Sequence, residues 1–275
     1  MTVAEQLVRS SEVVSFYRRL KKKRMSSIGG VRQSLSDIQT YENSKNSNSL
    51  GRIEKVIRLW SDFQQKQTLL NRKDGHLFNP LFLMSIGETK HSELLGYLLK
   101  PWEAHGYGDV FLVSFLHMLG VAEPERGKWS VTVEKGRIDL LLMRDDPKSV
   151  VIIENKSNNA VDQQNQLYRY WHRVIHQNCH IPFADYESEA VRAHFKIIYM
   201  PSGVHKEPER HSLRCPEYLR DSDSSLPHDL PLEYELKDYN EDVAQWLESI
   251  VELVEPSNVR LRTYLQFYTE LCKSL

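Results

Sequence analysis

The chain has 275 residues, 27% of them charged, and a formal net charge of −1 at pH 7. This length fits one large domain or two small ones, and the near-zero charge argues against a globally basic nucleic-acid-binding protein. Three cysteines argue against a disulfide framework, and the sequence has neither a signal-peptide core nor an apolar run of about 18 residues, so we expect a cytoplasmic protein without a membrane span.

Residues 1–50 are predicted to form an N-terminal region with a basic helix and a polar linker. Apolar residues up to Leu20 have near-helical spacing, and Arg18–Arg24 carries six cations. Such a run could contact a phosphate backbone, or it could be a solvated helix end whose cations suit the helix dipole. Residues 25–51 are poor in apolar side chains and rich in Ser, Asn and Gln, which predicts a linker.

Residues 51–275 are predicted to form the main domain, and they begin with helices. Apolar spacing predicts helices at 53–70 and 110–119. The sequence Ser85-Ile-Gly-Glu88 has the form of a capping box, in which the Glu88 side chain would accept a hydrogen bond from the Ser85 amide. His91 follows on the same helical face, and a histidine in this position is more typical of a hydrogen-bonded core residue than of a metal ligand.

Residues 129–156 are predicted to form three strands. Residues 129–134 alternate in polarity, and 138–143 and 150–153 are apolar runs rich in strand formers, with turn residues between them. If Met143 faces Val150, the hairpin register places Asp139 opposite Glu154, with Cβ atoms about 5 Å apart. Side-chain alternation then puts Lys156 on the same face as Glu154.

Two opposed carboxylates beside an ammonium group need an explanation, because opposed like charges destabilise a hairpin and burial raises the cost. A divalent cation such as Mg²⁺ between Asp139 and Glu154 would remove the repulsion. Lys156 could then hold or deprotonate a water molecule, or neutralise charge on a phosphate. The alternative is a solvated ion pair of Asp139 and Lys156 at the strand ends.

From Ala160 the pattern turns helical. Gln163, Gln166 and Tyr170 fall at i, i+3 and i+7, on one face. These side chains could orient Lys156, a water molecule or a phosphate, or they could form the polar face of an amphipathic helix.

A rival metal site is suggested by histidines and a cysteine in the following segment. His172, His176, Cys179 and His180 have a spacing compatible with zinc, with His211 and Cys215 further on. The sequence offers no Cys-x-x-Cys pair, so structural zinc is the less favoured interpretation.

The rest of the chain is predicted to contain a strand at 195–200, an irregular loop at 206–231 and helices at 241–253 and 258–275. The resulting order of helices and strands indicates an α/β fold with a mixed sheet.

Three of these features together resemble the signature of a known family. Asp139, followed on the next strand by Glu154-Asn155-Lys156, resembles the motif of the PD-(D/E)XK nuclease superfamily, with Ile138 in place of the proline. Gln166-Leu-Tyr-Arg-Tyr170 is similar to the Gln-x-x-x-Tyr element of its RecB-like branch. Similarity to a group of bacterial members extends from about Arg52 to the C-terminus, through Glu88–Leu95, His105–Gly108, Phe195–Gly203 and Tyr239–Trp246.

The resemblance implies a restriction-endonuclease-like fold and a nuclease that cleaves DNA with Mg²⁺ or Mn²⁺, RNA remaining open as a substrate. It also implies a setting in DNA processing or in defence against foreign DNA such as that of phages. The implied metal ligands are Asp139, Glu154, the Asn155 carbonyl and Glu88. Lys156 would position the attacking water or stabilise charge, and Gln166 would support the site. The alternative is a non-catalytic nucleic-acid- or protein-binding module on the same fold, which the loss of Asp139, Glu154 or Lys156 would have favoured.

Overall fold

The computed structural model describes residues 48–75, 78–203 and 206–275, without the side chains of 48–52 and 74. The chain divides into two compact units, Met1–Phe78 and Asn79–Leu275. The predicted domain boundary near residue 50 lies inside the first unit and stays a prediction. The basic run Arg18–Arg24 and most of the predicted linker lie outside the described residues. Within the described ranges, no helix is both long and apolar enough to cross a membrane.

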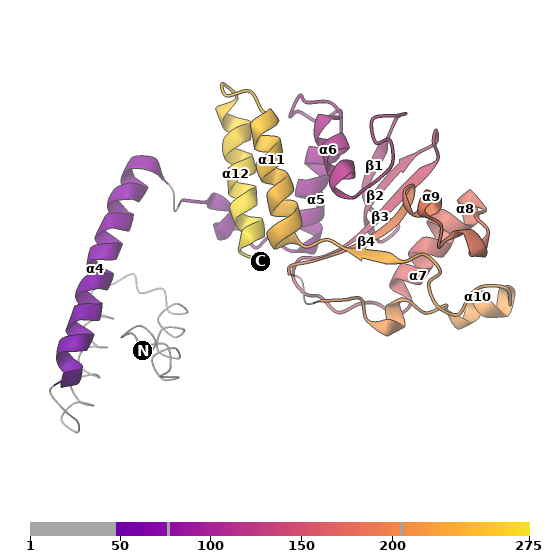
Figure 1. The fold of residues 1–275 in the computed structure, drawn as a ribbon, viewed down its shortest axis with the longest axis horizontal. Helices are drawn as coiled ribbons and strands as arrows, with labels where there is room; N and C mark the ends of the chain where they lie inside the picture. Colours follow the sequence, from indigo (N-terminus) through magenta and orange to yellow (C-terminus); the bar gives the residue numbers. More distant parts are fainter. Residues whose placement is uncertain (1–47, 76–77, 204–205) are drawn as a thin grey trace. The chain divides into compact units, whose positions relative to one another are not determined.

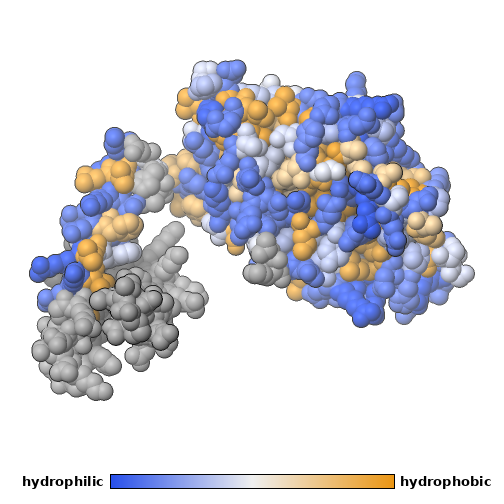
Figure 2. Space-filling model, in the orientation of Figure 1, coloured by the Kyte–Doolittle hydropathy of each residue, from blue (hydrophilic) through white to orange (hydrophobic). Residues whose placement is uncertain are grey.

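The first unit contributes one long described helix, α4, Asn48–Asp74. It contains the predicted helix at 53–70, and it begins inside the segment predicted to be a linker, so the prediction for residues 48–51 is wrong. Large apolar side chains on α4 lie exposed (Figure 2): Trp60 and Phe63 are each 51% exposed and Leu69 is 64% exposed. The rings of Trp60 and Phe63 stack with their centroids 5.8 Å apart.

The second unit is built on a five-stranded sheet with the order β1-β2-β3-β4-β5 (Figure 1). The strands are β1 Ser130–Lys135, β2 Ile138–Arg144, β3 Ser149–Lys156, β4 Phe195–Pro201 and β5 Tyr234–Leu236. The first three strands pair antiparallel, whereas β4 pairs parallel with both β3 and β5. The predicted α/β fold with a mixed sheet is therefore confirmed, and β5 is an addition that was not predicted.

Tight connections fix the register of the antiparallel strands. Gly136 and Arg137 form the β1–β2 turn with φ angles of 64° and 67°, a left-handed pair that suits the twist of a two-residue hairpin. Across the second hairpin Met143 pairs with Val150, which is the predicted register. The following pairs continue as far as Leu140 and Ile153. The register therefore carries the next residues of both strands to the open end of the hairpin.

One face of the sheet is covered by four α-helices, which bury most of the aliphatic core (Figure 1). They are α5 Glu88–Leu99, α6 Val110–Met118, α11 Ala244–Leu253 and α12 Val259–Lys273, with the short turns η1 Pro80–Leu83 and η5 Tyr239–Val243. Gly96 brings α5 close to the sheet, since a Cβ atom there would lie 2.3 Å from the Cγ2 atom of Val133. This close packing fixes where α5, and with it Glu88, sits against β1 and β2.

The opposite face is covered by shorter elements. They are α7 Gln166–Trp171, the π-helical turn η2 His172–His176, α8 Gln177–Cys179, η3 Phe183–Asp185, α9 Glu189–Arg192, η4 Arg210–Ser212 and α10 Glu217–Ser222. Trp171, Tyr168 and Tyr186 fill the core between these elements and the sheet. The segment 206–231, predicted to be irregular, thus contains two short helices. The helix predicted from Ala160 begins only at Gln166, so the preceding residues form a connection between the sheet and α7.

Candidate active site

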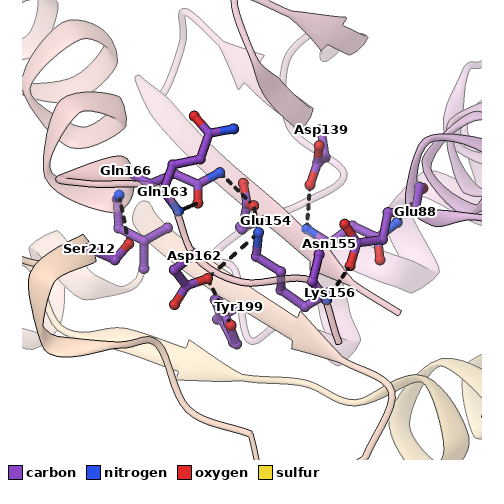
Figure 3. A network of polar contacts seen from close by, with 12 residues as sticks. Glu88, Asp139, Glu154, Asn155, Lys156, Asp162, Gln163, Gln166, Tyr199 and Ser212 are labelled. Carbon is purple, nitrogen blue, oxygen red and sulfur yellow. Dashed lines mark hydrogen bonds and ion pairs between the residues drawn. The ribbon is translucent and has the colours of Figure 1, made fainter. Parts of the chain in front are cut away.

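Polar side chains replace apolar ones at the open end of the β2–β3 hairpin (Figure 3). Asp139 lies one position into β2, and Glu154, Asn155 and Lys156 end β3, where all three are buried. The backbone N–H of Asn155 donates to Oδ2 of Asp139 at 2.6 Å. The confirmed register thus brings the predicted carboxylates to the same end of the hairpin.

Lys156 lies in contact with Glu154, as side-chain alternation predicts. Its Nζ atom is 2.7 Å from Oε1 of Glu154, and the two side chains are 5% and 2% exposed. A solvated ion pair at a strand end was the alternative interpretation, and this degree of burial argues against it. The ammonium group and the carboxylate are instead enclosed by the protein.

Gln166, the first residue of α7, holds Glu154 from the side. Its Nε2 atom donates to Oε1 of Glu154 at 2.7 Å and to the Tyr170 hydroxyl at 3.0 Å. The Tyr170 hydroxyl in turn donates to the carbonyl of Arg137 in the β1–β2 turn. The prediction that Gln163 shares this helical face is wrong, because Gln163 precedes α7 and is exposed. Gln163 contacts Gln166 through its backbone, whose N–H donates to Oε1 of Gln166 and whose carbonyl accepts from the Gln166 N–H.

Glu88 opens α5, and its side chain does not form the predicted capping box. The N-cap of α5 is Gly87 and has no side-chain cap, whereas Oε1 of Glu88 accepts from the backbone N–H of Ala160 at 3.1 Å. The Glu88 carbonyl accepts from Nδ2 of Asn155 at 2.6 Å, which fastens α5 to the end of β3. Glu88 therefore joins the network of Figure 3 and ties α5 to the segment that follows β3.

Asp162 is a further carboxylate in this cluster, and no sequence motif pointed to it. Its Oδ1 atom lies 3.6 Å from Nζ of Lys156 and accepts from the Tyr199 hydroxyl at 3.0 Å. Its Oδ2 atom accepts from the backbone N–H of Glu209 at 2.7 Å. In the sequence, Asp162 stands out only as an acidic residue between the Glu-x-Lys triplet and the Gln-x-x-x-Tyr element. The helix predicted from Ala160 included this residue, so its contact with Lys156 was not expected.

Burial and mutual repulsion perturb the acids of the cluster. Burial raises the pKa of Asp139 to about 7, with Glu134 and Glu88 adding to the rise. Burial and the charge of Asp139 raise the pKa of Glu154 to about 8, against the opposing effect of Lys156. For Lys156, burial acts to lower the pKa, but Glu154, Asp162 and Glu88 outweigh it, so its pKa lies above the ordinary value.

The histidines raised as rival ligands take part in packing. The rings of His172 and His176 stack at 5.3 Å, and Phe183 stacks on His176 at 5.4 Å. His91 is fully buried between Tyr239 and Tyr268, and burial lowers its pKa to about 4. Among the described residues, no group of three or more His, Cys, Asp or Glu side chains is placed to hold a metal.

Comparison with known proteins bears directly on this geometry. The family model described as PD-(D/E)XK nuclease superfamily matches residues 78–269. The chain belongs to this superfamily. A search of curated proteins found no match, and a search of solved structures found none either.

The residues that resemble the superfamily motif lie at the buried cluster. Asp139 is on β2, Glu154 and Lys156 are on β3, and Gln166 and Tyr170 are on α7, with Ile138 at the position of the proline. The matched segment begins at the boundary between the two compact units, so α4 lies outside it.

PD-(D/E)XK nucleases generally use divalent metals, and the residues of the cluster fit such an ion. Oε2 of Glu154 is buried and accepts no hydrogen bond from any described residue. Asp139 and Glu154 repel one another, as the raised pKa of Glu154 indicates. Two carboxylates suffice for Mg²⁺, which otherwise takes waters and substrate phosphates as ligands.

Proposed function

We propose that the protein is a Mg²⁺- or Mn²⁺-dependent nuclease that hydrolyses phosphodiester bonds in DNA. The observation that carries the proposal is the buried convergence of Asp139, Glu154 and Lys156 at one end of the β2–β3 hairpin. Buried like charges are costly unless a cation compensates them, and one lysine cannot balance all the acids of this cluster. Membership of a nuclease superfamily supports the same conclusion.

Asp139 and Glu154 would hold the divalent cation, and the resemblance to the superfamily implies the Asn155 carbonyl and Glu88 as further ligands. A cation bound there would polarise a phosphate oxygen and lower the pKa of a water molecule. Lys156 orients the attacking water, whose oxygen forms a bond to phosphorus as the bond to the leaving oxygen breaks and a proton passes to that oxygen. The ammonium group also offsets the negative charge that develops on the phosphate.

Gln166 keeps Glu154 in position for this role. The side-chain amide of Gln166 donates a hydrogen bond to Oε1 of Glu154. Oε2 of Glu154 accepts none from the described residues. Because Gln166 is also bonded to Tyr170, and Tyr170 to the β1–β2 turn, the carboxylate is fixed relative to both strands that carry the site. Fixing a ligand through a second residue is how metal sites are commonly oriented.

The first test is a matrix of substrates and metals. Linear, circular and single-stranded DNA, and RNA, are incubated with the full chain in Mg²⁺, Mn²⁺ or EDTA. We expect cleavage of DNA with either metal and none in EDTA. Cleavage of circular DNA would indicate an endonuclease, and cleavage of linear DNA alone an exonuclease.

The second test asks whether the cluster carries the activity. Glu154→Ala and Lys156→Ala should each remove most cleavage while the protein stays folded. Glu235→Gln serves as the matched control, because Glu235 also pairs with a buried lysine, Lys196, but on β5 and β4 away from the motif. Full activity in both site variants would show that the assignment is wrong, and a DNA-binding protein without cleavage would favour a non-catalytic module.

We infer a cytoplasmic role in DNA processing or in defence against foreign DNA, by analogy with the superfamily alone. Loss of protection against phage infection in cells that carry the Glu154→Ala variant would support defence.

A further inference from the structure

Lys156 lies between two buried carboxylates, and only one of them is part of the superfamily motif. Its Nζ atom is 2.7 Å from Glu154 and 3.6 Å from Asp162. The Asp162 side chain is fully buried, with 0% exposure. Figure 3 shows the ammonium group with Glu154 on one side and Asp162 on the other. The lysine thus has a close partner and a second partner within reach.

The two carboxylates differ in how their oxygens are used. Both oxygens of Asp162 accept hydrogen bonds from fixed donors, the Tyr199 hydroxyl and the Glu209 backbone N–H. Glu154, in contrast, leaves Oε2 without a donor among the described residues. A metal ligand needs a free oxygen, so Glu154 suits a divalent cation, whereas Asp162 suits a fixed anion.

We propose that Asp162 is a positioning residue that takes over the Lys156 ammonium when Glu154 binds a divalent cation. This inference rests on the proposed function, and it assigns to Asp162 the role of keeping Lys156 in place. When a cation binds Glu154, it neutralises part of the carboxylate charge, and the ion pair between Glu154 and Lys156 weakens. An ammonium group this deeply buried then needs another anion, because a buried unpaired charge is strongly destabilising.

The change required of Lys156 is small. Oδ1 of Asp162 already lies within ion-pair distance, and a charge-assisted hydrogen bond is about 2.8 Å long, so a rotation near the end of the lysine side chain is enough. Asp162 is held from β4 by Tyr199 and from the segment before η4 by Glu209. A fixed anion at this place keeps the ammonium charged and beside the metal ligands after Glu154 has released it.

The test uses Asp162→Asn in the full chain. An asparagine can still accept from the Glu209 N–H and donate to the Tyr199 hydroxyl, so the substitution removes the charge and keeps the shape. Among the described residues, Glu154 is then the one ion-pair partner left to Lys156, so Lys156 and the cation compete for it. We expect the Mn²⁺ concentration that gives half of the maximal melting-temperature shift to rise about tenfold or more, as for other residues that support a metal ligand. At saturating Mn²⁺ we expect kcat to fall about tenfold, with KM for DNA unchanged.

Lys156→Met and the double variant separate this role from two alternatives. Without the lysine, no ammonium group competes with the cation for Glu154, so Lys156→Met should bind Mn²⁺ at least as well as wild type. Adding Asp162→Asn to Lys156→Met should then change the Mn²⁺ midpoint no further. If Asp162 were itself a metal ligand, the double variant would bind Mn²⁺ more weakly than Lys156→Met. Such a result would overturn the inference.

Glu235→Gln controls for a purely structural effect, since it removes a carboxylate from another buried lysine. It should lower the melting temperature without moving the Mn²⁺ midpoint. If Asp162→Asn also lowers the melting temperature without moving the Mn²⁺ midpoint or kcat, Asp162 has a purely structural role. The inference is then wrong, while the proposed nuclease function still stands. If wild type neither cleaves DNA nor binds Mn²⁺, the proposed function fails and the inference fails with it.

Discussion

The β2–β3 hairpin buries a cation at each of its ends, and the two are held in different ways. Beside the turn, Arg144 is 3% exposed and lies 4.6 Å over the ring of Trp129. Its guanidinium group donates to the Ser149 hydroxyl and to the backbone carbonyls of Ala122, Glu123 and Arg126. Beside the open end, Lys156 lies between the carboxylates of Glu154 and Asp162.

Under the proposed function, this difference distinguishes a structural cation, Arg144, from a reactive one, Lys156. Neutral oxygens accept from Arg144, and three of these hydrogen bonds fasten the segment 122–126 to the hairpin turn. At the other end the partners are acids, one of their oxygens lacks a donor among the described residues, and burial raises the pKa of Glu154 to about 8. Perturbed acids around a buried lysine are typical of functional sites.

The same substitution at both ends of the hairpin tests the different roles of the two cations. Lys156→Met should lower cleavage by about 10²- to 10⁴-fold, because under the proposed function it removes the group that orients water and offsets charge. Arg144→Met should retain cleavage per folded molecule. Rates are measured on both proteins with the folded fraction determined by circular dichroism. Similar losses in the two variants would show that the distinction between the ends is wrong.

Stability should respond in the opposite order. Arg144→Met removes a buried guanidinium group and leaves three partly buried carbonyls without this donor, so we expect the free energy of unfolding to fall by about 3 kcal/mol in urea melts. Arg126→Met is the exposed control: its pairs with Glu123 and Asp146 lie at the surface and contribute at most about 1 kcal/mol. Equal losses for the two substitutions would remove the structural role assigned to Arg144.

Asp139→Asn tests whether Asp139, at the open end of the hairpin, is a metal ligand. The asparagine Oδ1 can still accept from the Asn155 N–H, and one buried charge is lost, so without metal the variant should be as stable as wild type or more stable. Wild type should gain about 2.7 kcal/mol at a Mn²⁺ concentration 100 times Kd, and the variant should lose most of this gain. Melts in EDTA and in a Mn²⁺ series measure both effects. Equal metal-induced shifts would exclude Asp139 as a ligand; if neither protein shifts, the series is repeated with a non-cleavable DNA whose phosphates complete the site.

The smallest expected effect is on pH dependence. Burial raises the pKa of Asp139 to about 7 and that of Glu154 to about 8, so the folded protein without metal retains protons that the unfolded chain releases. This contribution is complete at low pH and is lost as the pH rises through about 7 to 8.

The histidines determine the pH range in which the effect of these acids on stability can be measured. Burial lowers the pKa of His91 to about 4, which makes stability rise with pH up to about 6.5, the value for an unfolded histidine. Between about pH 6.5 and 8 the acids therefore dominate, and wild type in EDTA should lose on the order of 1 to 2 kcal/mol. Asp139→Asn should show a shallower loss, measured by urea melts at constant ionic strength. A rise in wild-type stability over this window would contradict the raised pKa values.

Much of the fold was predictable because β2 and β3 are continuous apolar runs with a short polar turn between them. Period and turn chemistry fix the Met143–Val150 register, and the register carries Asp139 and Glu154 to one end. β5 was missed since three half-buried residues give no periodic signal. The start of α7 was placed too early because Ala160 to Asn165 has the composition of a helix, while its backbone groups and side chains bond to distant segments.

The contacts of the candidate site were predictable from local patterns where residues lie on the hairpin or on α7, whereas Glu88 on α5 was indicated by the resemblance to the superfamily. Glu154 and Lys156 share a strand, so alternation alone brings them together. Asp162 reaches Lys156 through a non-periodic connection held by Tyr199 and Glu209, which come from parts of the chain far along the sequence. The capping box at Ser85 and Glu88 was a local pattern that lost to a tertiary contact, the hydrogen bond from Ala160. Local rules cannot anticipate such partners.

The connection between the parallel strands β3 and β4 has a consequence for how the protein folds. β2 and β3 are joined by a short turn, whereas β3 reaches β4 only after the whole segment from Ser157 to His194. Closing a short loop costs less chain entropy than closing a long one, so the hairpin is expected to form first. Asp139, Glu154 and Lys156 would then meet early, in water, where their charges are screened. Tyr199 and Asp162 would arrive later and enclose a cluster that is already assembled, so the desolvation of these charges would fall on the last stages of folding.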